Sequence, residues 1–140
     1  MKMLLAVDGS PISSRAAKFV TKLAKEMAGP LEVILFNADP PLMQAVAIKI
    51  GLQAAAKYHA ENGASAIKSA RATLKRAHVA FVEKLVVGEP ASAIAKMAKA
   101  ERCDVIVMGS HGHTALQTLF VGSVTAKVIA QSDVPVVVAR

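Results

Sequence analysis

Short apolar runs alternate along the chain with segments in which apolar residues recur every three or four positions. Five runs have the strand pattern: residues 2–7, 32–38, 79–87, 104–108 and 134–139. They are nearly continuous in aliphatic residues, as expected for strands that are covered on both faces. Because these strands alternate with helical segments, the pattern predicts an α/β fold with an open, five-stranded parallel sheet and helices on both faces.

The clearest helix signal follows the first strand. Ser10 precedes Pro11, so its hydroxyl can cap a helix in which proline takes the first position. Gly29-Pro30 predicts the end of this helix. Between these signals, one helical face is apolar and contains Ala16, Val20, Leu23, Ala24 and Met27.

The middle of the chain, residues 40–60, has the weakest pattern. It begins with Asp39-Pro40-Pro41, and one helical face contains Leu42, Val46, Ile50 and Ala54. Three roles are open for this face: it fills the core, covers a pocket or contacts a partner. Asn62-Gly63 indicates a break. We therefore predict a variable segment followed by a helix over residues 60–77.

Length and composition describe one folded domain spanning residues 1–140. The hydrophobic fraction is 54% and the charged fraction 19%, which excludes intrinsic disorder. No run approaches the roughly 20 apolar residues needed to span a bilayer. Asp8 ends the first apolar run too early for a signal peptide. The lone Cys103 fits a reducing compartment, so we expect a cytoplasmic protein.

The chain carries 17 Lys and Arg against 10 Asp and Glu, a net charge of +7 that favours anionic partners. The basic residues form three stripes at helical spacing, which we interpret as solvated helix faces. Nucleic acid is a weaker prediction, because a binding groove needs aromatic residues between the charges and the chain has no Trp and one Tyr. The stripes are Lys18, Lys22 and Lys25; Lys68, Arg71, Lys75 and Arg76; and Lys96, Lys99 and Arg102.

A glycine pattern follows the fourth strand: Gly109 and Gly112, then nine residues, then Gly122-Ser123. Glycine lets backbone approach a ligand closely. Ser123 begins the last predicted helix, so its free N–H groups and dipole would face the same crevice as the strand ends. The pattern predicts a phosphate cradle without a lysine, although glycines of this spacing can also serve only as turns.

Four blocks follow one another along the chain: Asp8-Gly9-Ser10, Val87-Gly88-Glu89-Pro90, the Gly-x2-Gly-x9-Gly-Ser pattern, and Val134-Pro135-Val136-Val137-Val138. With these blocks in this order, the chain resembles the universal stress proteins, in particular the subgroup that binds ATP. The resemblance covers essentially the whole chain.

The resemblance implies a Rossmann-like sheet in the order 3-2-1-4-5 and a homodimer paired through the last strand, residues 134–139. It implies ATP, ADP or AMP as the ligand, with Mg²⁺ accompanying a triphosphate. The acid at Asp8 would contact the ribose, and backbone at Ala6 and Ala38 would line the adenine pocket. The predicted nucleotide-binding residues are Ala6, Val7, Asp8, Ala38, Met108, Gly109, His111, Gly112, His113, Gly122, Ser123 and Val124.

The chain departs from the family in the nine-residue loop, residues 113–121. Family members often carry Lys or Arg there, whereas His113 is the only titratable group in this loop. Without a cation, the triphosphate loses a charge-assisted hydrogen bond worth about 1.5–3 kcal/mol, so ADP or AMP can compete. We expect ATP affinity to rise below about pH 6.5 if His113 protonates beside the phosphates.

Other chemistries lack their motifs. The chain has no P-loop, no Gly-x-Gly-x-x-Gly after the first strand and no Gly-x-Ser-x-Gly around Ser110. His111 and His113 are the only pair spaced to chelate a metal, and we predict no metal site, because Cys103 and His59 are not at a ligand spacing. Asp8 is the only acid near the predicted phosphates, so we expect at most slow ATP hydrolysis.

Two functions follow. The first is an adenine-nucleotide-binding stress or regulatory protein. The second is an interaction module for a transporter, kinase or other effector, in which nucleotide is absent or structural. In either case the apolar last strand, at the edge of the sheet, would pair with a second copy, because an unpaired edge of this kind aggregates.

Overall fold

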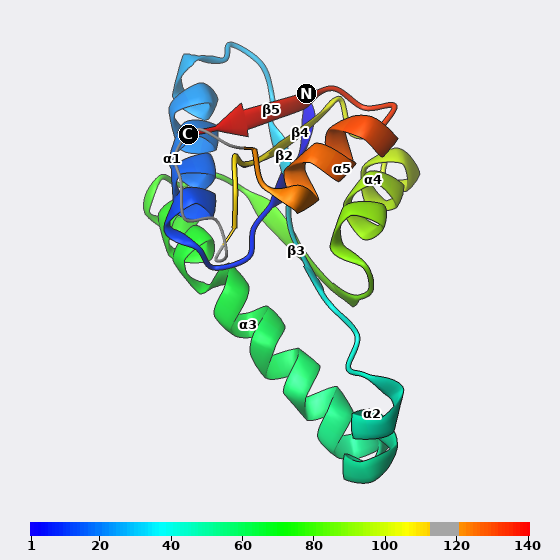
Figure 1. Cartoon of the computed structure of the whole chain (residues 1–140). Helices are drawn as coiled ribbons and strands as arrows, with labels where there is room; N and C mark the ends of the chain where they lie inside the picture. Colours follow the sequence, from blue (N-terminus) through cyan, green and yellow to red (C-terminus); the bar gives the residue numbers. More distant parts are fainter. Residues whose placement is uncertain (113–120) are drawn as a thin grey trace.

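The computed structural model describes residues 1–112 and 121–140. Within them, five strands form one parallel sheet in the order β3-β2-β1-β4-β5, which confirms the predicted fold and strand order (Figure 1). The elements are β1 (Lys2–Ala6), α1 (Pro11–Glu26), β2 (Glu32–Asp39), α2 (Gln44–Ile50), α3 (Leu52–Arg76), β3 (Phe81–Val87), α4 (Pro90–Ala100), β4 (Val105–Gly109), α5 (Ser123–Gln131) and β5 (Val136–Ala139).

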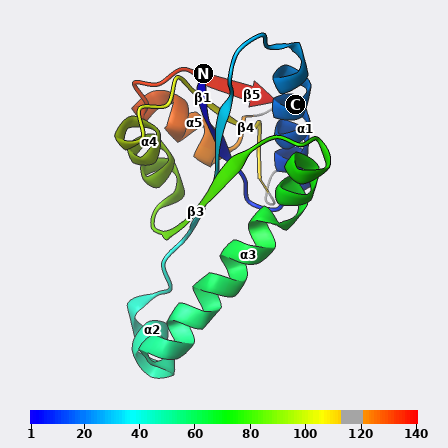
Figure 2. The ribbon, with the colours of Figure 1, turned by 180° about the vertical axis from the view of Figure 1, so that it is seen from behind.

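Helices cover both faces of the sheet, and β1 at its centre shows why its sequence is apolar throughout. Met3 and Leu5 pack on one face, in a core shared with α1 and α3. Leu4 and Ala6 pack on the other, in a core shared with α4 and α5. Alternate strand residues point to opposite faces, so a strand covered twice has no polar side. Figures 1 and 2 show the two helix layers from opposite sides.

The first helix begins as predicted. The Ser10 hydroxyl accepts a hydrogen bond from the backbone N–H of Ser13 at 3.2 Å, and Pro11 takes the first helical position. Proline costs nothing there, because the N–H it lacks would have no partner inside the helix. The start of α1 is thereby fixed at the carboxyl end of β1, where Asp8 lies.

The prediction for the middle of the chain was wrong in two respects. The helix begins at Leu52 rather than near residue 60, and Asn62-Gly63 does not break it. Gly63 is buried, and a Cβ atom there would lie 3.1 Å from Cδ1 of Leu85 on β3. The glycine therefore allows α3 to approach β3, which the sequence pattern cannot distinguish from a turn signal.

The α2 helix and the first half of α3 project from the sheet (Figures 1 and 2). α2 contains no buried residue. Val46 and Ile50, two residues of the helical face predicted over residues 42–54, are 41% and 42% exposed, so this face contributes little to the core. A turn at Gly51, with φ +85°, separates α2 from α3.

Three strands are shorter than predicted, and the first of them, β1, ends at Ala6 rather than residue 7. β3 begins at Phe81 rather than residue 79, and β5 at Val136 rather than residue 134. The Val134 N–H donates to the Ser132 hydroxyl at 3.0 Å, which places Val134 in a turn. β5 does lie at the edge of the sheet, as predicted.

The three predicted basic stripes lie on helix surfaces, apart from Arg102 in the turn after α4, and all their members but one are exposed. The exception is Arg71, which donates to both carboxylate oxygens of Glu83 on β3 at 2.5 and 2.8 Å. Across residues 1–112 and 121–140, no helix combines the length and apolar character needed to cross a bilayer.

Candidate functional site

The carboxyl ends of β1, β2 and β4 meet at one edge of the sheet, where they border a cavity of about 510 Å³. Ligands of open α/β sheets bind at this edge, at the topological switch point. There the crossover connections lead away from one strand in opposite directions along the sheet. Here that strand is β1, which pairs with β2 on one side and β4 on the other. The start of α5, one turn of α3 and residues near the starts of α1 and α4 complete the wall of the cavity.

The structure brings nearly all the predicted nucleotide-binding residues to this cavity. His113 lies outside the described residues. The others line the cavity: Ala6, Val7, Asp8, Ala38, Met108, Gly109, His111, Gly112, Gly122, Ser123 and Val124.

Each of the three glycines in the motif lies very close to an atom of a neighbouring residue. A Cβ at Gly109 would lie 2.6 Å from Cγ2 of Ile12, and one at Gly122 would lie 2.9 Å from Cα of His111. At Gly112 it would lie 2.5 Å from Oδ2 of Asp8. These separations are shorter than van der Waals contact, so a side chain at any of them would displace its neighbour. The motif therefore shapes the cavity and does more than form turns.

The start of α5 is tied to the end of β4 by two hydrogen bonds. The Gly122 N–H donates to the Ser110 carbonyl at 2.7 Å, and the Thr125 hydroxyl donates to the Gly109 carbonyl at 2.9 Å. Gly122 is the N-cap residue and has no side chain to accept the first N–H groups of the helix. The N–H groups of Ser123 and Val124 are thus held at the cavity without a capping side chain.

The α4 helix, which also begins beside the cavity, is already capped. The Glu89 carboxylate accepts hydrogen bonds from the N–H groups of Ser92 at 2.7 Å and Ala91 at 3.3 Å. These backbone hydrogen bonds, the one from Ser92 foremost, hold the pKa of Glu89 below its usual range. An anion bound at α4 would have to displace this carboxylate, whereas α5 presents its N-terminus to the cavity directly.

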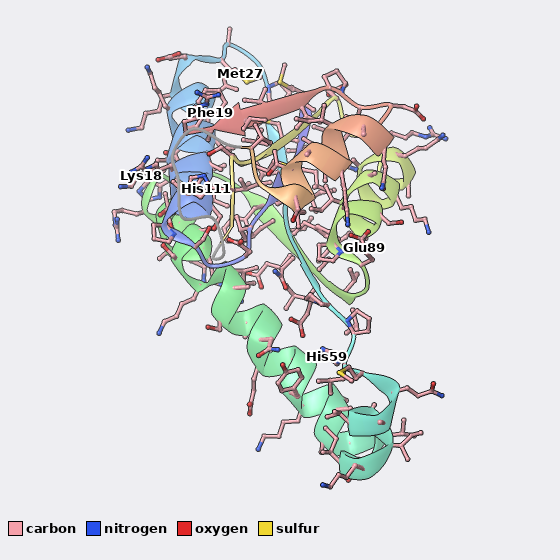
Figure 3. The ribbon with its side chains drawn as sticks, viewed as in Figure 1. Lys18, Phe19, Met27, His59, Glu89 and His111 are labelled. Carbon is pink, nitrogen blue, oxygen red and sulfur yellow. The ribbon has the colours of Figure 1, made fainter. Side chains whose placement is uncertain are left out.

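Asp8 and His111 are the titratable side chains at the end of the cavity near the glycines. Oδ1 of Asp8 accepts from the Ser10 N–H at 2.9 Å, which orients its carboxylate beside Gly112. The His111 Nδ1 lies 2.9 Å from the hydroxyl of the buried Ser110. Figure 3 shows His111 near the start of α1.

Within the described ranges, no Lys or Arg lines the cavity. An anionic ligand would therefore meet backbone N–H groups and the His111 imidazole, with the Asp8 carboxylate beside them. Asp8 suits a hydroxyl donor rather than a phosphate, because like charges repel and a carboxylate accepts hydrogen bonds. The cavity thus favours a ligand that carries both an anionic group and neutral hydroxyl groups.

Sequence reasoning missed the wall of the cavity opposite α5. Asp39, Asn62 and Ser65 line it. Asp39 ends β2, so the rule that ligands bind at strand ends could have found it. Asn62 and Ser65 had no such signal, because the predicted break at residues 62–63 put them outside a continuous helix. The face over residues 42–54 does not line the cavity, so it does not cover the pocket.

Asn37 braces the junction between β1 and β2. Its side-chain amide donates to the Val7 carbonyl at 2.8 Å, and both residues are buried.

Among the residues that the structure describes, no group of three His, Cys, Asp or Glu side chains is arranged to hold a metal ion.

A model of the universal stress protein family matches residues 1–140. A universal stress protein of Thermus aquaticus is 33% identical over 145 residues, which cover 99% of this chain and 97% of its own. The solved structure of MJ0577, a universal stress protein of Methanocaldococcus jannaschii, has a TM-score of 0.82 at 30% identity, covering 99% of this chain and 94% of its own.

A second solved structure, a universal stress protein in complex with cAMP, has a TM-score of 0.71 at 23% identity and covers 100% of this chain and 97% of its own. At this identity the likeness concerns the fold. The family model spans residues 1–140, and the Thermus relative covers 99% of the chain. The chain therefore belongs to the universal stress protein family.

Proposed function

We propose that this protein binds an adenine nucleotide in the cavity at the carboxyl edge of the sheet and acts in a stress response or its regulation. The observation that carries the proposal is the pairing of an uncapped helix N-terminus, at Ser123 and Val124, with three glycines at which a Cβ would displace a neighbouring atom. Other proteins of this fold have been solved with cAMP, dAMP and AMP, which supports the choice of adenine.

The cavity suggests how such a ligand lies. The phosphates would accept hydrogen bonds from the start of α5, and the ribose hydroxyls would donate to Asp8. The base would lie toward Ala38 at the end of β2, on the far side of β1 from the phosphates. Mg²⁺ would arrive with a triphosphate, near Asp8. Since no second carboxylate lines that end in the described residues, hydrolysis would be slow.

Calorimetric titration of ATP, ADP and AMP into nucleotide-free protein tests the proposal. A Ser123→Pro variant removes one N–H donor, yet proline suits the first position of a helix, and Gly122 before it is already extended with ψ 159°. We expect the fold to be kept and the affinity to fall by about tenfold, the loss of one hydrogen bond to a charged group.

Ser123→Ala is the matched variant, because it keeps the N–H and loses only the hydroxyl. Gly122→Val should abolish binding through its clash with His111, whereas Gly29→Val, whose Cβ would meet nothing within 4 Å, should not. Absence of binding by the wild-type protein to all three nucleotides would refute the proposal.

We propose a homodimer through β5 as part of the same function. β5 is an edge strand, and Val137 on it and Phe19 on the neighbouring α1 are 36% and 38% exposed. Pairing two copies would satisfy the edge and cover these side chains. Sedimentation analysis of wild type and Val137→Lys tests it, with a monomeric wild type as the contrary result. A cytoplasmic location, consistent with the free Cys103, completes the proposal.

The alternative function, an interaction module for an effector protein, is favoured by one observation. Met43, Ile48 and Leu52 expose apolar side chains on the part of the chain that projects from the sheet. For an interaction module, we expect that an effector protein that binds the wild-type protein does not bind an Ile48→Gln, Leu52→Gln variant. This result should be the same with and without bound nucleotide.

A further inference from the structure

Asp39, His59 and Asn62 form a polar cluster where α3 meets the end of β2. Oδ2 of Asp39 lies 2.5 Å from Nδ1 of His59, and it accepts a hydrogen bond from the side-chain amide of Asn62 at 3.1 Å. The Asp39 and His59 side chains are only 16% and 13% exposed. Figure 3 shows His59 on α3 beside the chain that leaves β2.

One oxygen of Asp39 is held, and the other is available. Oδ2 takes both hydrogen bonds, whereas Oδ1 accepts none from any residue in the ranges 1–112 and 121–140. Oδ1 is not a buried atom without a partner, since no such atom occurs among the described side chains. Asp39 and Asn62 both line the cavity, so this oxygen can meet a ligand there.

The cluster lies at the opposite end of the cavity from the start of α5. β1 separates β2, which carries Asp39, from β4, which leads toward α5. A carboxylate at this end repels phosphate groups, while the α5 N-terminus attracts them. A nucleotide would therefore enter with its phosphates at α5 and its base beside Asp39.

We propose that Asp39, positioned by His59 and Asn62, selects adenine by accepting a hydrogen bond from its 6-amino group. This inference rests on the proposed nucleotide-binding function and names its base specificity. Guanine and hypoxanthine carry a carbonyl oxygen at the same position, so two acceptors would face each other. A carboxylate can also bind guanine through both oxygens, but here Oδ2 is already occupied by the two α3 side chains.

The base itself can be varied first, with the wild-type protein. We expect ATP to bind at least about tenfold more tightly than purine riboside triphosphate, which only lacks the 6-amino group, and more tightly than ITP and GTP. Equal affinities for ATP and purine riboside triphosphate would overturn the inference while leaving the nucleotide-binding function intact. Failure to bind any nucleotide would refute both.

The Asp39→Asn substitution then replaces the hydrogen-bond acceptor that faces the base with a donor. Its amide oxygen can still accept from His59 and Asn62, and its NH₂ group would face the base as a donor. We expect the ratio of ATP to ITP affinity to fall by about tenfold or more. Glu61→Gln is the matched control, because it removes the same charge from an exposed neighbour on α3 that pairs with Lys57 and does not line the cavity.

The ratio of ATP to ITP affinity also tests whether Asn62 on α3 positions the Asp39 carboxylate. Asn62→Ala should lower the ATP to ITP ratio to a lesser degree, because Asp39 loses one of the two groups that orient it. A merely structural role for Asn62 would weaken ATP and ITP equally. An unchanged ratio in both Asp39→Asn and Asn62→Ala, in folded protein, would overturn the inference.

Discussion

The α-carbon of Gly112 lies so close to the Asp8 carboxylate that a Cβ there would be 2.5 Å from Oδ2. The carboxylate is held on its other side, because Oδ1 accepts from the Ser10 N–H. The first strand and the glycine motif, about one hundred residues apart in sequence, thus fix each other at the cavity. The glycine is needed so that the acid can lie where the ribose is proposed to bind.

Gly112→Ala should reduce nucleotide affinity without unfolding the protein. The new methyl group would push the end of a flexible, exposed side chain, which costs little stability, but it would turn Asp8 away from the ribose. We expect a loss of about tenfold in affinity for ATP by calorimetry, the loss of one hydrogen bond to a charged group. Gly29→Ala is the control, since its Cβ would meet nothing within 4 Å. Unchanged affinity in Gly112→Ala would argue against a ribose contact at Asp8.

Substitution of Gly63 tests the contact between α3 and β3. Valine at this buried helical position would overlap Leu85 and restrict its own rotamers, so we expect a loss of about 1–3 kcal/mol in the free energy of unfolding. Alanine should be close to neutral, because its better helix propensity, about 1 kcal/mol, offsets a 3.1 Å contact with the movable Leu85 side chain. Urea denaturation measures both. A Gly63→Val protein as stable as wild type would show that α3 does not approach β3 this closely.

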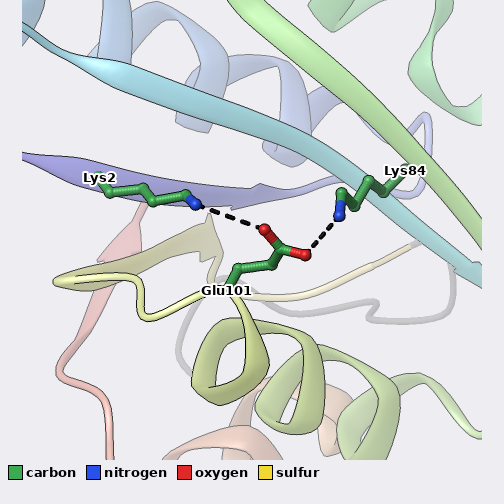
Figure 4. Close-up of polar contacts among 3 residues, drawn as sticks. All are labelled: Lys2, Lys84 and Glu101. Carbon is green, nitrogen blue, oxygen red and sulfur yellow. Dashed lines mark hydrogen bonds and ion pairs between the residues drawn. The ribbon is translucent and has the colours of Figure 1, made fainter.

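Glu101 should make stability depend on pH in the acid range. It follows α4 and bridges Lys84 on β3 and, at 3.4 Å, Lys2 on β1 (Figure 4). The hydrogen bonds from Lys84 and then Lys2 hold its pKa below the usual value of 4.5. The carboxylate therefore stabilises the fold above that value, and the contribution is lost as the pH falls toward the lower, folded pKa.

Glu101→Gln should accordingly melt at a lower temperature than wild type at pH 7, and the difference should narrow as the pH falls through 4.5. Thermal unfolding followed by circular dichroism across this range measures it. Glu61→Gln serves for comparison, because its pair with Lys57 is exposed and contributes little. A constant difference between Glu101→Gln and wild type from pH 7 to pH 3 would contradict the assignment.

Cys103 should react slowly in the native protein. It is 7% exposed, and burial, the largest influence, raises the pKa of its thiol. Both effects lower the concentration of accessible thiolate, the nucleophilic form. We expect its modification by a disulfide reagent at pH 8 to be at least about tenfold slower in native than in urea-unfolded protein. Equal rates in the two states would mean that the thiol is accessible in the native protein.

The strand order and much of the cavity could be predicted from the chain, for identifiable reasons. The runs around Leu4, Ile34 and Ile106 are apolar on both faces, as strands between two helix layers require. The Ser10-Pro11 pair fixed the start of α1, and with it the position of Asp8. Parallel strands bring their carboxyl ends together, so residues just after them could be assigned to one site before any contact was known.

The α3 wall of the cavity could not be predicted in this way. Asn62-Gly63 is locally a turn signal, and nothing near it in sequence indicates that Leu85 lies opposite Gly63. Nor does the chain indicate that Asp39 finds its partners 20 and 23 residues away. Such contacts depend on how a helix crosses a sheet.

The sequence by itself determined the family, the parallel sheet and the glycine motif. These features depend on local periodicity and on short spacings, which can be recognised without knowing how the helices and strands pack. Only the tertiary structure decided what each glycine is close to, which helix N-terminus is uncapped and which oxygen of Asp39 is engaged. Those properties arise between elements distant in sequence, and side-chain contacts of this kind exist only once the helices are packed on the sheet.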